Sequence, residues 1–173
     1  MIQPDKVRAE AKKKENENFK FHTFLKCHAD EEELDSQFLR LHKELFAGYD
    51  CSKCRNCCRM YKGNIPAEDI DRDAQFLEIT PEQFIDTYLE KGEYGMGYQT
   101  KHKPCDFLQE DGNCKLSDCK PDSCKKYPYT YRSERLSSLL SILDTIEICP
   151  VAFEIFERLK QEYGFRTHRK IIE

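Results

Sequence analysis

Four cysteines within eight positions, CSKCRNCC at residues 51–58, constrain this chain more than any other feature. Core packing does not explain them, because thiolates so close together repel one another unless a cation, a cluster or disulfides hold them. The spacing Cys51-x-x-Cys54-x-x-Cys57-Cys58 brings several sulfurs within reach of one centre. It therefore predicts a metal or iron–sulfur site.

The remaining composition indicates where such a site would operate. The chain has ten cysteines in 173 residues and begins MIQPDKVRAEAKKK, without an apolar leader. No window approaches the roughly 18 apolar residues of a membrane span, so we expect no membrane partner. We expect a cytoplasmic protein, because a reducing compartment keeps thiols available for metals or redox work. A net charge of -4 gives no general reason to expect nucleic acid as a partner.

Apolar side chains recur at helical spacing through much of the chain, which predicts a mainly α fold. We expect a small single domain of short helices and irregular cysteine-rich loops, organised around a metal or iron–sulfur site. Residues 1–47 should form an N-terminal helical segment that packs on the core, residues 48–164 the cysteine-cluster domain and residues 165–173 a flexible tail. Charged residues make up 35% of the chain, so the apolar core is small and bound metal should support it.

Two helices are expected before the cysteines. The first covers residues 4–26 and should dock only by its C-terminal half. The second follows Asp30, which with Glu33 resembles a capping box. Its apolar stripe comprises Leu34, Phe38, Leu41, Leu45 and Phe46.

Further helices are expected after the first cysteines. Ile65-Pro66 should open a short one, and Thr80 with Gln83 indicates another capping box. The segment GEYGMGY at residues 92–98 should form a flexible turn. A stripe of Leu136, Leu139, Leu140, Leu143 and Ile146 predicts one late helix, and Pro150 begins the last, with Val151, Ile155, Phe156, Leu159 and Tyr163 on its core face.

A second group of cysteines follows at residues 103–128, where turn signals surround them. Cys105, Cys114, Cys119 and Cys124 are therefore expected on loops or short turns. Cys27 should be a partly buried thiol outside the site. His28 and His102 are the histidines nearest to cysteines, and a capping or surface role is the better interpretation of both.

The cysteine spacing leaves two interpretations open. Cys51, Cys54 and Cys57 reproduce the first three spacings of the bacterial ferredoxin run, and Cys149-Pro150 reproduces its final Cys-Pro at a remote position, which favours an iron–sulfur cluster on these four residues. Alternatively, eight or more cysteines could close two all-thiolate tetrahedral zinc sites.

The ordered blocks CSKCRNCC, PCDFL, GNCKLSDCKPDSCKKYP and CP resemble the YkgJ-type cysteine-cluster family, whose domain is described as zinc- or iron-chelating. The resemblance covers about residues 48–151. It implies metal-ligand roles for Cys51, Cys54, Cys57, Cys58, Cys105, Cys114, Cys124 and Cys149. Within this set, Cys58 points away from Cys57 if the local chain is extended, and it would then join Cys105, Cys114 and Cys124 in a second site. Ser117 and Lys120 stand where the family usually has Tyr and Arg, and Cys119 is an extra cysteine.

Three functions follow from these observations. The first is an iron–sulfur protein with a redox or electron-transfer role, an oxidoreductase if it is an enzyme, and we favour this cofactor over zinc. The second is a zinc-stabilised module that binds a protein without catalysis. The third is a group-transfer enzyme, because the motif also resembles the cluster segment of flagellin lysine N-methylases. Each implies an unidentified protein or redox partner. The lysines and arginines around both cysteine groups are interpreted as charge compensation rather than an RNA-binding patch.

Overall fold

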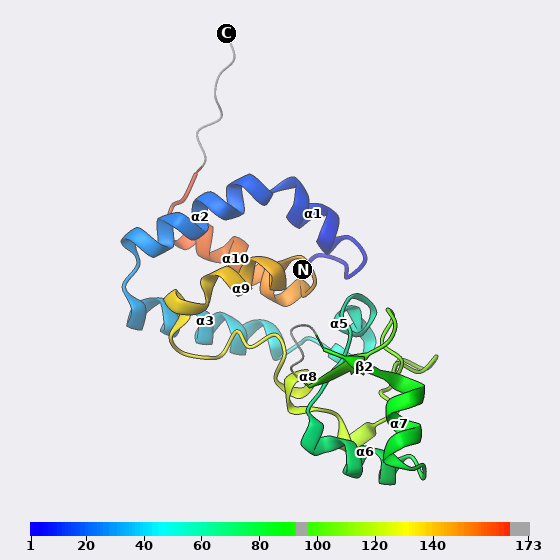
Figure 1. Cartoon of the computed structure of the whole chain (residues 1–173). Helices are drawn as coiled ribbons and strands as arrows, with labels where there is room; N and C mark the ends of the chain where they lie inside the picture. Colours follow the sequence, from blue (N-terminus) through cyan, green and yellow to red (C-terminus); the bar gives the residue numbers. More distant parts are fainter. Residues whose placement is uncertain (93–96, 167–173) are drawn as a thin grey trace. The chain divides into compact units, whose positions relative to one another are not determined.

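The computed structural model describes residues 1–92 and 97–166 (Figure 1). The chain is mainly α, as the apolar spacing predicted. It divides into two compact units: Met1–Asp50 with Pro128–Glu173, here called the helical unit, and Cys51–Tyr127, here called the cysteine unit. None of the helices in the described part of the chain combines the length and apolar character that a membrane span requires.

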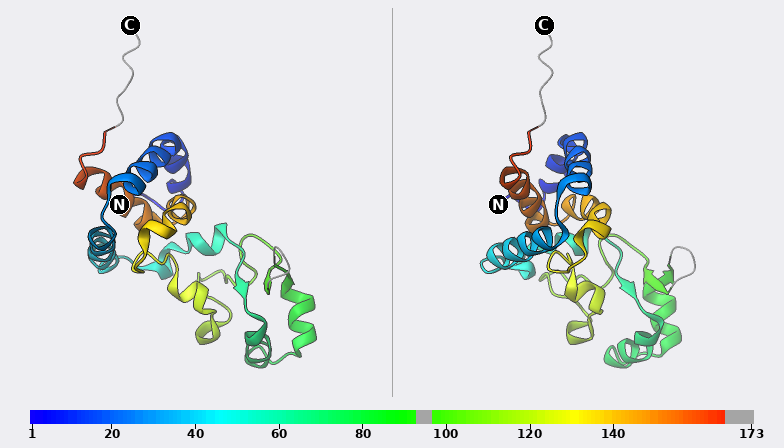
Figure 2. Two further views of the ribbon diagram at one scale, coloured as in Figure 1. Left: turned by 60° about the vertical axis from the view of Figure 1, so that its left-hand side comes forward. Right: turned by 90° about the vertical axis from the view of Figure 1, so that its left-hand side faces the viewer.

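The helical unit packs helices from both ends of the chain around one core. Its helices are α1 (Val7–Lys13), α2 (Glu15–His28), α3 (Glu31–Phe46), α9 (Arg135–Ile146) and α10 (Pro150–Glu162). α10 packs against α3 and α9, and α2 packs against α9 (Figures 1 and 2). The core includes Phe21, Leu25, Phe38, Leu41, Leu139, Ile142, Ile155 and Phe156. Residues distant in sequence therefore share this core.

The helix boundaries follow from local signals. The Asp30 carboxylate accepts a hydrogen bond from the Glu33 backbone at 3.0 Å, which caps α3. Pro150 occupies the first turn of α10, as expected. The first expected helix is instead two helices, α1 and α2, with Lys14 between them. Docking by the C-terminal half alone is wrong, because Val7 and Ala11 of α1 are also buried.

One assignment in the stripe of α9 is also wrong. Leu140 is 63% exposed, whereas Ile142 is buried beside Leu139 and Ile146. The core face of α9 is therefore rotated relative to the expected stripe, because neighbouring helices α2, α3 and α10 contact α9 from more than one direction.

A buried lysine joins α2 to α10. Lys160 is only 4% exposed, and its ammonium group lies 2.7 Å from a carboxylate oxygen of Glu17, 2.6 Å from Asn18 Oδ1 and 2.6 Å from a carboxylate oxygen of Glu157. Lys14 also pairs with Glu157. Three oxygen partners satisfy all three donors of the ammonium, which is what a buried charge requires.

The cysteine unit consists of short elements. They are α4 (Cys51–Cys54), α5 (Asn56–Met60), β1 (Asn64–Ile65), a 3-10 turn (Ala67–Asp69), α6 (Ile70–Phe76), α7 (Pro81–Tyr88), β2 (Leu89–Lys91), β3 (Tyr98–Thr100), a second 3-10 turn (Ser117–Cys119) and α8 (Asp122–Lys126). The strands form an antiparallel sheet in the order β1-β3-β2, with Ile65 opposite Tyr98 and Glu90 opposite Gln99. α6 packs against α7.

The capping box at α7 is confirmed in both directions. The Gln83 backbone donates to Thr80 Oγ1 at 3.2 Å, and the Thr80 backbone donates to Gln83 Oε1 at 3.0 Å. The strands were not expected, because elements of two or three residues are too short to show a period of two. The Gly92 backbone donates a hydrogen bond to the Gly97 carbonyl at 3.1 Å, where β2 and β3 are connected. Gly95, also expected in this turn, lies outside the described residues.

The cysteine unit has its own apolar core. It contains Ile65, Ile70, Ala74, Phe84, Leu89, Phe107 and Leu116. The rings of Phe84 and Phe107 stack with centroids 5.7 Å apart. Cys105, Cys114 and Cys119 pack against this cluster. The core therefore supports one side of the cysteine-bearing segments.

Candidate metal centre

The first cysteines lie on two short helices rather than on extended chain. Cys51 and Cys54 begin and end α4, so they share one helical turn, and Cys57 and Cys58 are neighbours in α5. Arg55 separates the helices with a left-handed backbone, φ 50°. The expectation that an extended chain would direct Cys58 away from Cys57 is therefore wrong. The two sulfurs are 4.0 Å apart.

Arginine side chains fix this bend. Arg55 Nε donates to the Ser52 carbonyl at 3.0 Å, and its guanidinium lies 3.4 Å from Asn113 Oδ1. Arg59 donates to the Cys54 carbonyl at 2.7 Å. These bonds satisfy carbonyl groups that short helices leave without an intrahelical partner. They also attach the first cysteine segment to the segment near residue 113.

Cys105 and Cys114 lie on a small hairpin-like loop. The Lys115 backbone donates to the Phe107 carbonyl at 2.7 Å, and the Gln109 backbone donates to the Asn113 carbonyl at 2.9 Å. Leu108 and Cys114 form a single antiparallel bridge. Gly112 turns the chain with φ +83°, a conformation that favours glycine. The loop thus brings two cysteines nine positions apart in sequence to the same region.

Backbone contacts bring this loop to Cys58. The Cys105 backbone donates to the Cys58 carbonyl at 2.8 Å. Gly63 lies beneath them, where an added Cβ would be 3.3 Å from Cys105 Sγ and 3.3 Å from Thr100 Cγ2. The Gly63 backbone also donates to the buried Thr100 hydroxyl at 2.9 Å. A side chain at position 63 would push Cys105 away from this arrangement.

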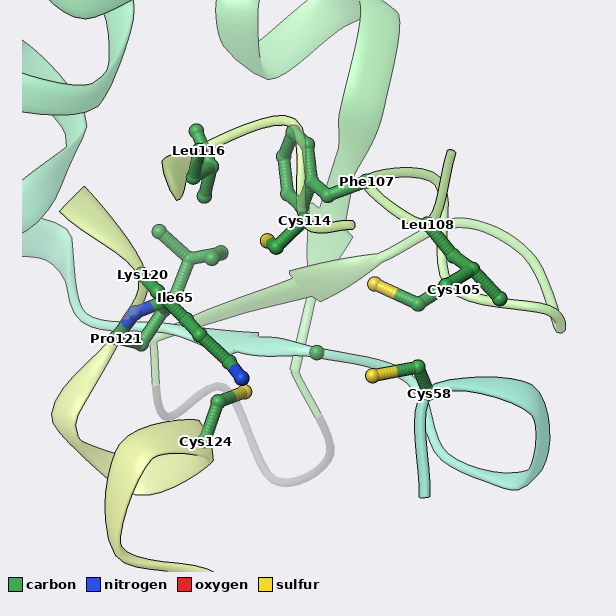
Figure 3. A pocket seen from close by; sticks show the side chains of 11 residues that line it. Cys58, Ile65, Cys105, Phe107, Leu108, Cys114, Leu116, Lys120, Pro121 and Cys124 are labelled. Carbon is green, nitrogen blue, oxygen red and sulfur yellow. The ribbon is translucent and has the colours of Figure 1, made fainter. Parts of the chain in front are cut away.

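Four cysteines from three segments line one pocket of the cysteine unit (Figure 3). They are Cys58, Cys105, Cys114 and Cys124. Apolar walls come from Ile65, Phe107, Leu108, Leu116 and Pro121, and the cavity volume is about 30 Å³. Figure 3 shows the sulfurs of Cys58, Cys105 and Cys124 directed toward the middle of this space. Cys124 reaches it from α8, a one-turn helix where a loop or short turn was expected.

The donor set fits a thiophilic metal. Four thiols with an apolar surround match an all-thiolate site, whose metal–sulfur bonds are about 2.3 Å for zinc. As the side chains stand, however, no three Cys, His, Asp or Glu residues within 1–92 and 97–166 are close enough to share one ion. Thiol groups at a pocket wall can rotate about χ1 between staggered positions, which changes the distances between their sulfurs.

The thiols differ in acidity. The pKa of Cys58 is lowered to about 6, chiefly by its hydrogen bond with Cys57, while burial opposes the shift and the charges of Lys120, Arg55 and Arg59 add to it. Burial raises the pKa of Cys124 to about 11 despite the nearby Lys120. Burial also raises the pKa of Cys105, although hydrogen bonds from Phe107 and Thr100 oppose it. A metal ion that binds here must displace protons from at least Cys105 and Cys124.

The structure places the other cysteines elsewhere. Cys149 belongs to the helical unit, where it is buried at the N-cap of α10. That Cys149 shares a metal centre with Cys51, Cys54 and Cys57 stays a prediction. Cys119 packs against the apolar core, and its carbonyl accepts a bond from Arg72 at 2.9 Å. Cys27 is exposed, so the expectation of a partly buried thiol is wrong.

Sequence reasoning missed two residues that shape the pocket, Gly63 and Thr100. Neither belongs to a cysteine block, and no spacing rule relates them to Cys105. The expected surface role of His102 fits its exposed side chain, which lies 2.6 Å from the Asp106 carboxylate. Asp106 also accepts a bond from the His102 backbone at 2.9 Å, which shapes the turn before the loop.

A family comparison identifies the domain. Residues 50–150 match the model of the CxxCxxCC family, described as "Putative zinc- or iron-chelating domain". The chain belongs to the CxxCxxCC family. The matched residues contain every cysteine for which a ligand role was expected, from Cys51 to Cys149. Neither a curated protein nor a solved structure matches the chain. The comparison supports cysteine-ligated binding of zinc or iron by this domain.

Proposed function

We propose that this chain is a metal-binding protein in which Cys58, Cys105, Cys114 and Cys124 hold one metal ion. The observation that carries the proposal is their convergence on a single pocket from three separate segments. Nothing in apolar packing requires four thiols at one place. Four thiolates around one divalent ion form a closed tetrahedral site of the structural kind.

The ligand set favours a single ion at this position. Four thiols are a complete ligand set for one tetrahedral ion in a closed structural site. We therefore propose zinc, or one iron ion, for this pocket. When bound, the ion would tie the loop at residues 105–114 to α5 and α8.

We propose a separate role for the other group of predicted ligands. Cys51, Cys54 and Cys57 retain the spacing of an iron–sulfur run. The fourth ligand that the sequence predicts, Cys149, lies at the start of α10 in the helical unit, where the positive end of the helix stabilises a thiolate. This centre would supply electron transfer to a protein partner. A reducing cytoplasm suits both centres, because it keeps the thiols available.

The test is metal and sulfide analysis of the full chain, purified without oxygen. We expect the wild type to hold one zinc or iron ion per chain more than Cys124→Ser. The variant should lose this ion, because serine is a poor substitute for thiolate. Cys119→Ser is the matched control, since Cys119 lies five positions away and packs on the core instead. Unchanged metal content in Cys124→Ser would contradict the pocket assignment.

The visible spectrum separates the two cofactors. A brown chromophore that Cys51→Ser or Cys149→Ser removes, with stoichiometric sulfide, would support an electron-transfer protein. A colourless protein with zinc alone would instead support a zinc-stabilised module that binds a protein. The apolar pocket of Cys58 and its partners favours this second candidate, because a closed zinc site is structural rather than catalytic.

A further inference from the structure

Lys120 is the cationic side chain in the wall of the thiol pocket. It enters between the second 3-10 turn and α8, two segments that also position Cys124. Lys120 as a whole is half-buried. Figure 3 shows its side chain in the wall of the pocket that Cys58 and Cys124 also line.

Other basic residues of the cysteine unit pair with carboxylates, whereas Lys120 does not within the described residues. Lys62 pairs with Glu90, Lys126 pairs with Asp122, and Arg72 pairs with Asp69 and Asp73. Within residues 1–92 and 97–166, no Asp or Glu forms a salt bridge with Lys120. Among the groups of the pocket wall, the thiols are therefore the ones that can carry a negative charge opposite this ammonium.

The sulfurs are the groups that share the pocket with this ammonium. Cys58 belongs to α5 and Cys124 to α8, and both line the same pocket as Lys120. One ammonium is therefore placed with thiols from two segments of the pocket.

We infer that Lys120 is a positioning residue for the metal centre: its ammonium donates a hydrogen bond to a ligating sulfur and offsets part of the negative charge of the ligand set. The inference rests on the proposed function of the pocket. A divalent ion with four thiolates carries two negative charges in excess, and Lys120 removes one of them. Charged groups and hydrogen bonds around a centre tune its affinity and reduction potential in this way.

The test compares Lys120→Met with Lys120→Arg and with Lys125→Met in the full chain. Lys125 is the matched control, because it is exposed and its ammonium bonds the Asp118 carbonyl instead of facing the pocket. Zinc affinity is measured by competition with a chromophoric chelator. We expect Lys120→Met to weaken zinc binding about 10–100-fold, as for other residues that support metal ligands. Lys120→Arg should recover most of the loss, and Lys125→Met should match the wild type.

A second readout separates charge from packing. With iron in place of zinc, Lys120→Met should lower the reduction potential, because losing a positive charge favours the oxidised ion. Equal zinc affinity and equal potential in wild type and Lys120→Met would overturn the inference alone. The inference would also be overturned if Lys120→Arg bound zinc as weakly as Lys120→Met. If Cys124→Ser binds as much zinc as the wild type, or if the wild type binds no zinc, the proposed centre is wrong and the inference is wrong with it.

Discussion

The helical unit buries long apolar side chains between helices of 7 to 16 residues, whereas the cysteine unit joins elements of 2 to 8 residues through irregular loops. In the first, Phe21 and Phe156 meet edge to face with centroids 5.1 Å apart. In the second, a small core around Phe84 and Phe107 packs against Cys105 and Cys114. Ile65, Phe107 and Leu116 of this core also line the pocket of thiols.

This difference indicates what each unit needs for stability. Apolar burial between long helices supplies a driving force that depends little on ligands. Short elements bury less surface for each residue that is ordered, so a bound ion contributes much of their folding free energy. We therefore expect mutations in the helical core to act regardless of metal, and the cysteine loops to respond to metal.

The largest expected effect of a substitution is in the helical core. Phe156→Ala should destabilise the helical unit by about 3–5 kcal/mol, because it removes a buried ring and leaves a cavity. Leu140→Ala is the control, since Leu140 is 63% exposed and should change stability by less than about 0.5 kcal/mol. Urea denaturation followed by circular dichroism measures both. Equal effects of the two variants would refute this description of the core.

Acid should weaken the helical unit through Glu157. Burial favours a raised pKa for this carboxyl group, but hydrogen bonds from Lys14 and Lys160 outweigh burial and hold its pKa below the ordinary value. Because the pKa is lower in the folded state, the ionised Glu157 contributes stability above the unfolded value of about 4.3. That contribution is lost as the pH falls toward the folded pKa.

The urea midpoint measured from pH 6 down to pH 3 tests this linkage. In Glu157→Gln the decline should be shallower, because a neutral amide does not titrate there. Glu10→Gln is a useful comparison, since Glu10 pairs with Lys13 at the surface and such pairs contribute little. An equally steep decline in wild type and Glu157→Gln would contradict the assignment.

The smallest expected effect concerns a helix cap in the cysteine unit. Thr80→Ala removes the hydroxyl that accepts the Gln83 backbone bond, so α7 should lose about 1 kcal/mol. Thr80→Ser keeps the hydroxyl and should restore most of that stability. Hydrogen exchange at the first turn of α7 is the measurement. Faster exchange in Thr80→Ser than in Thr80→Ala would exclude a capping role.

The sequence predicted the helices well where the apolar period was long. The caps at Asp30 and Thr80 and the helix start at Pro150 depend on neighbouring residues alone, so they could be identified without a structure. Leu140 was misassigned because periodicity does not specify which faces of α9 other helices cover. The strands near residues 64–65, 89–91 and 98–100 were missed because they are too short for a pattern.

The candidate site could be predicted as a set of thiols but not as an arrangement. The family resemblance, with an extended chain assumed at Cys58, identified Cys58, Cys105, Cys114 and Cys124 as possible partners. The assumption was wrong, since the backbone of Cys58 is helical. The close approach at Gly63 and the hydroxyl of Thr100 depend on tertiary contacts with Cys105. The place of Lys120 in the pocket likewise depends on how the segment before α8 folds.

The most direct test of the account is hydrogen exchange of the full chain with and without metal. Removal of metal under reducing conditions should abolish most protection of backbone amides at residues 105–124, because the thiol pocket then loses the ion that joins its segments. Amides in the middle of α2 and α9 should keep their protection. The account would be contradicted if a demonstrably metal-free sample protected residues 105–124 as strongly as the metal-loaded protein.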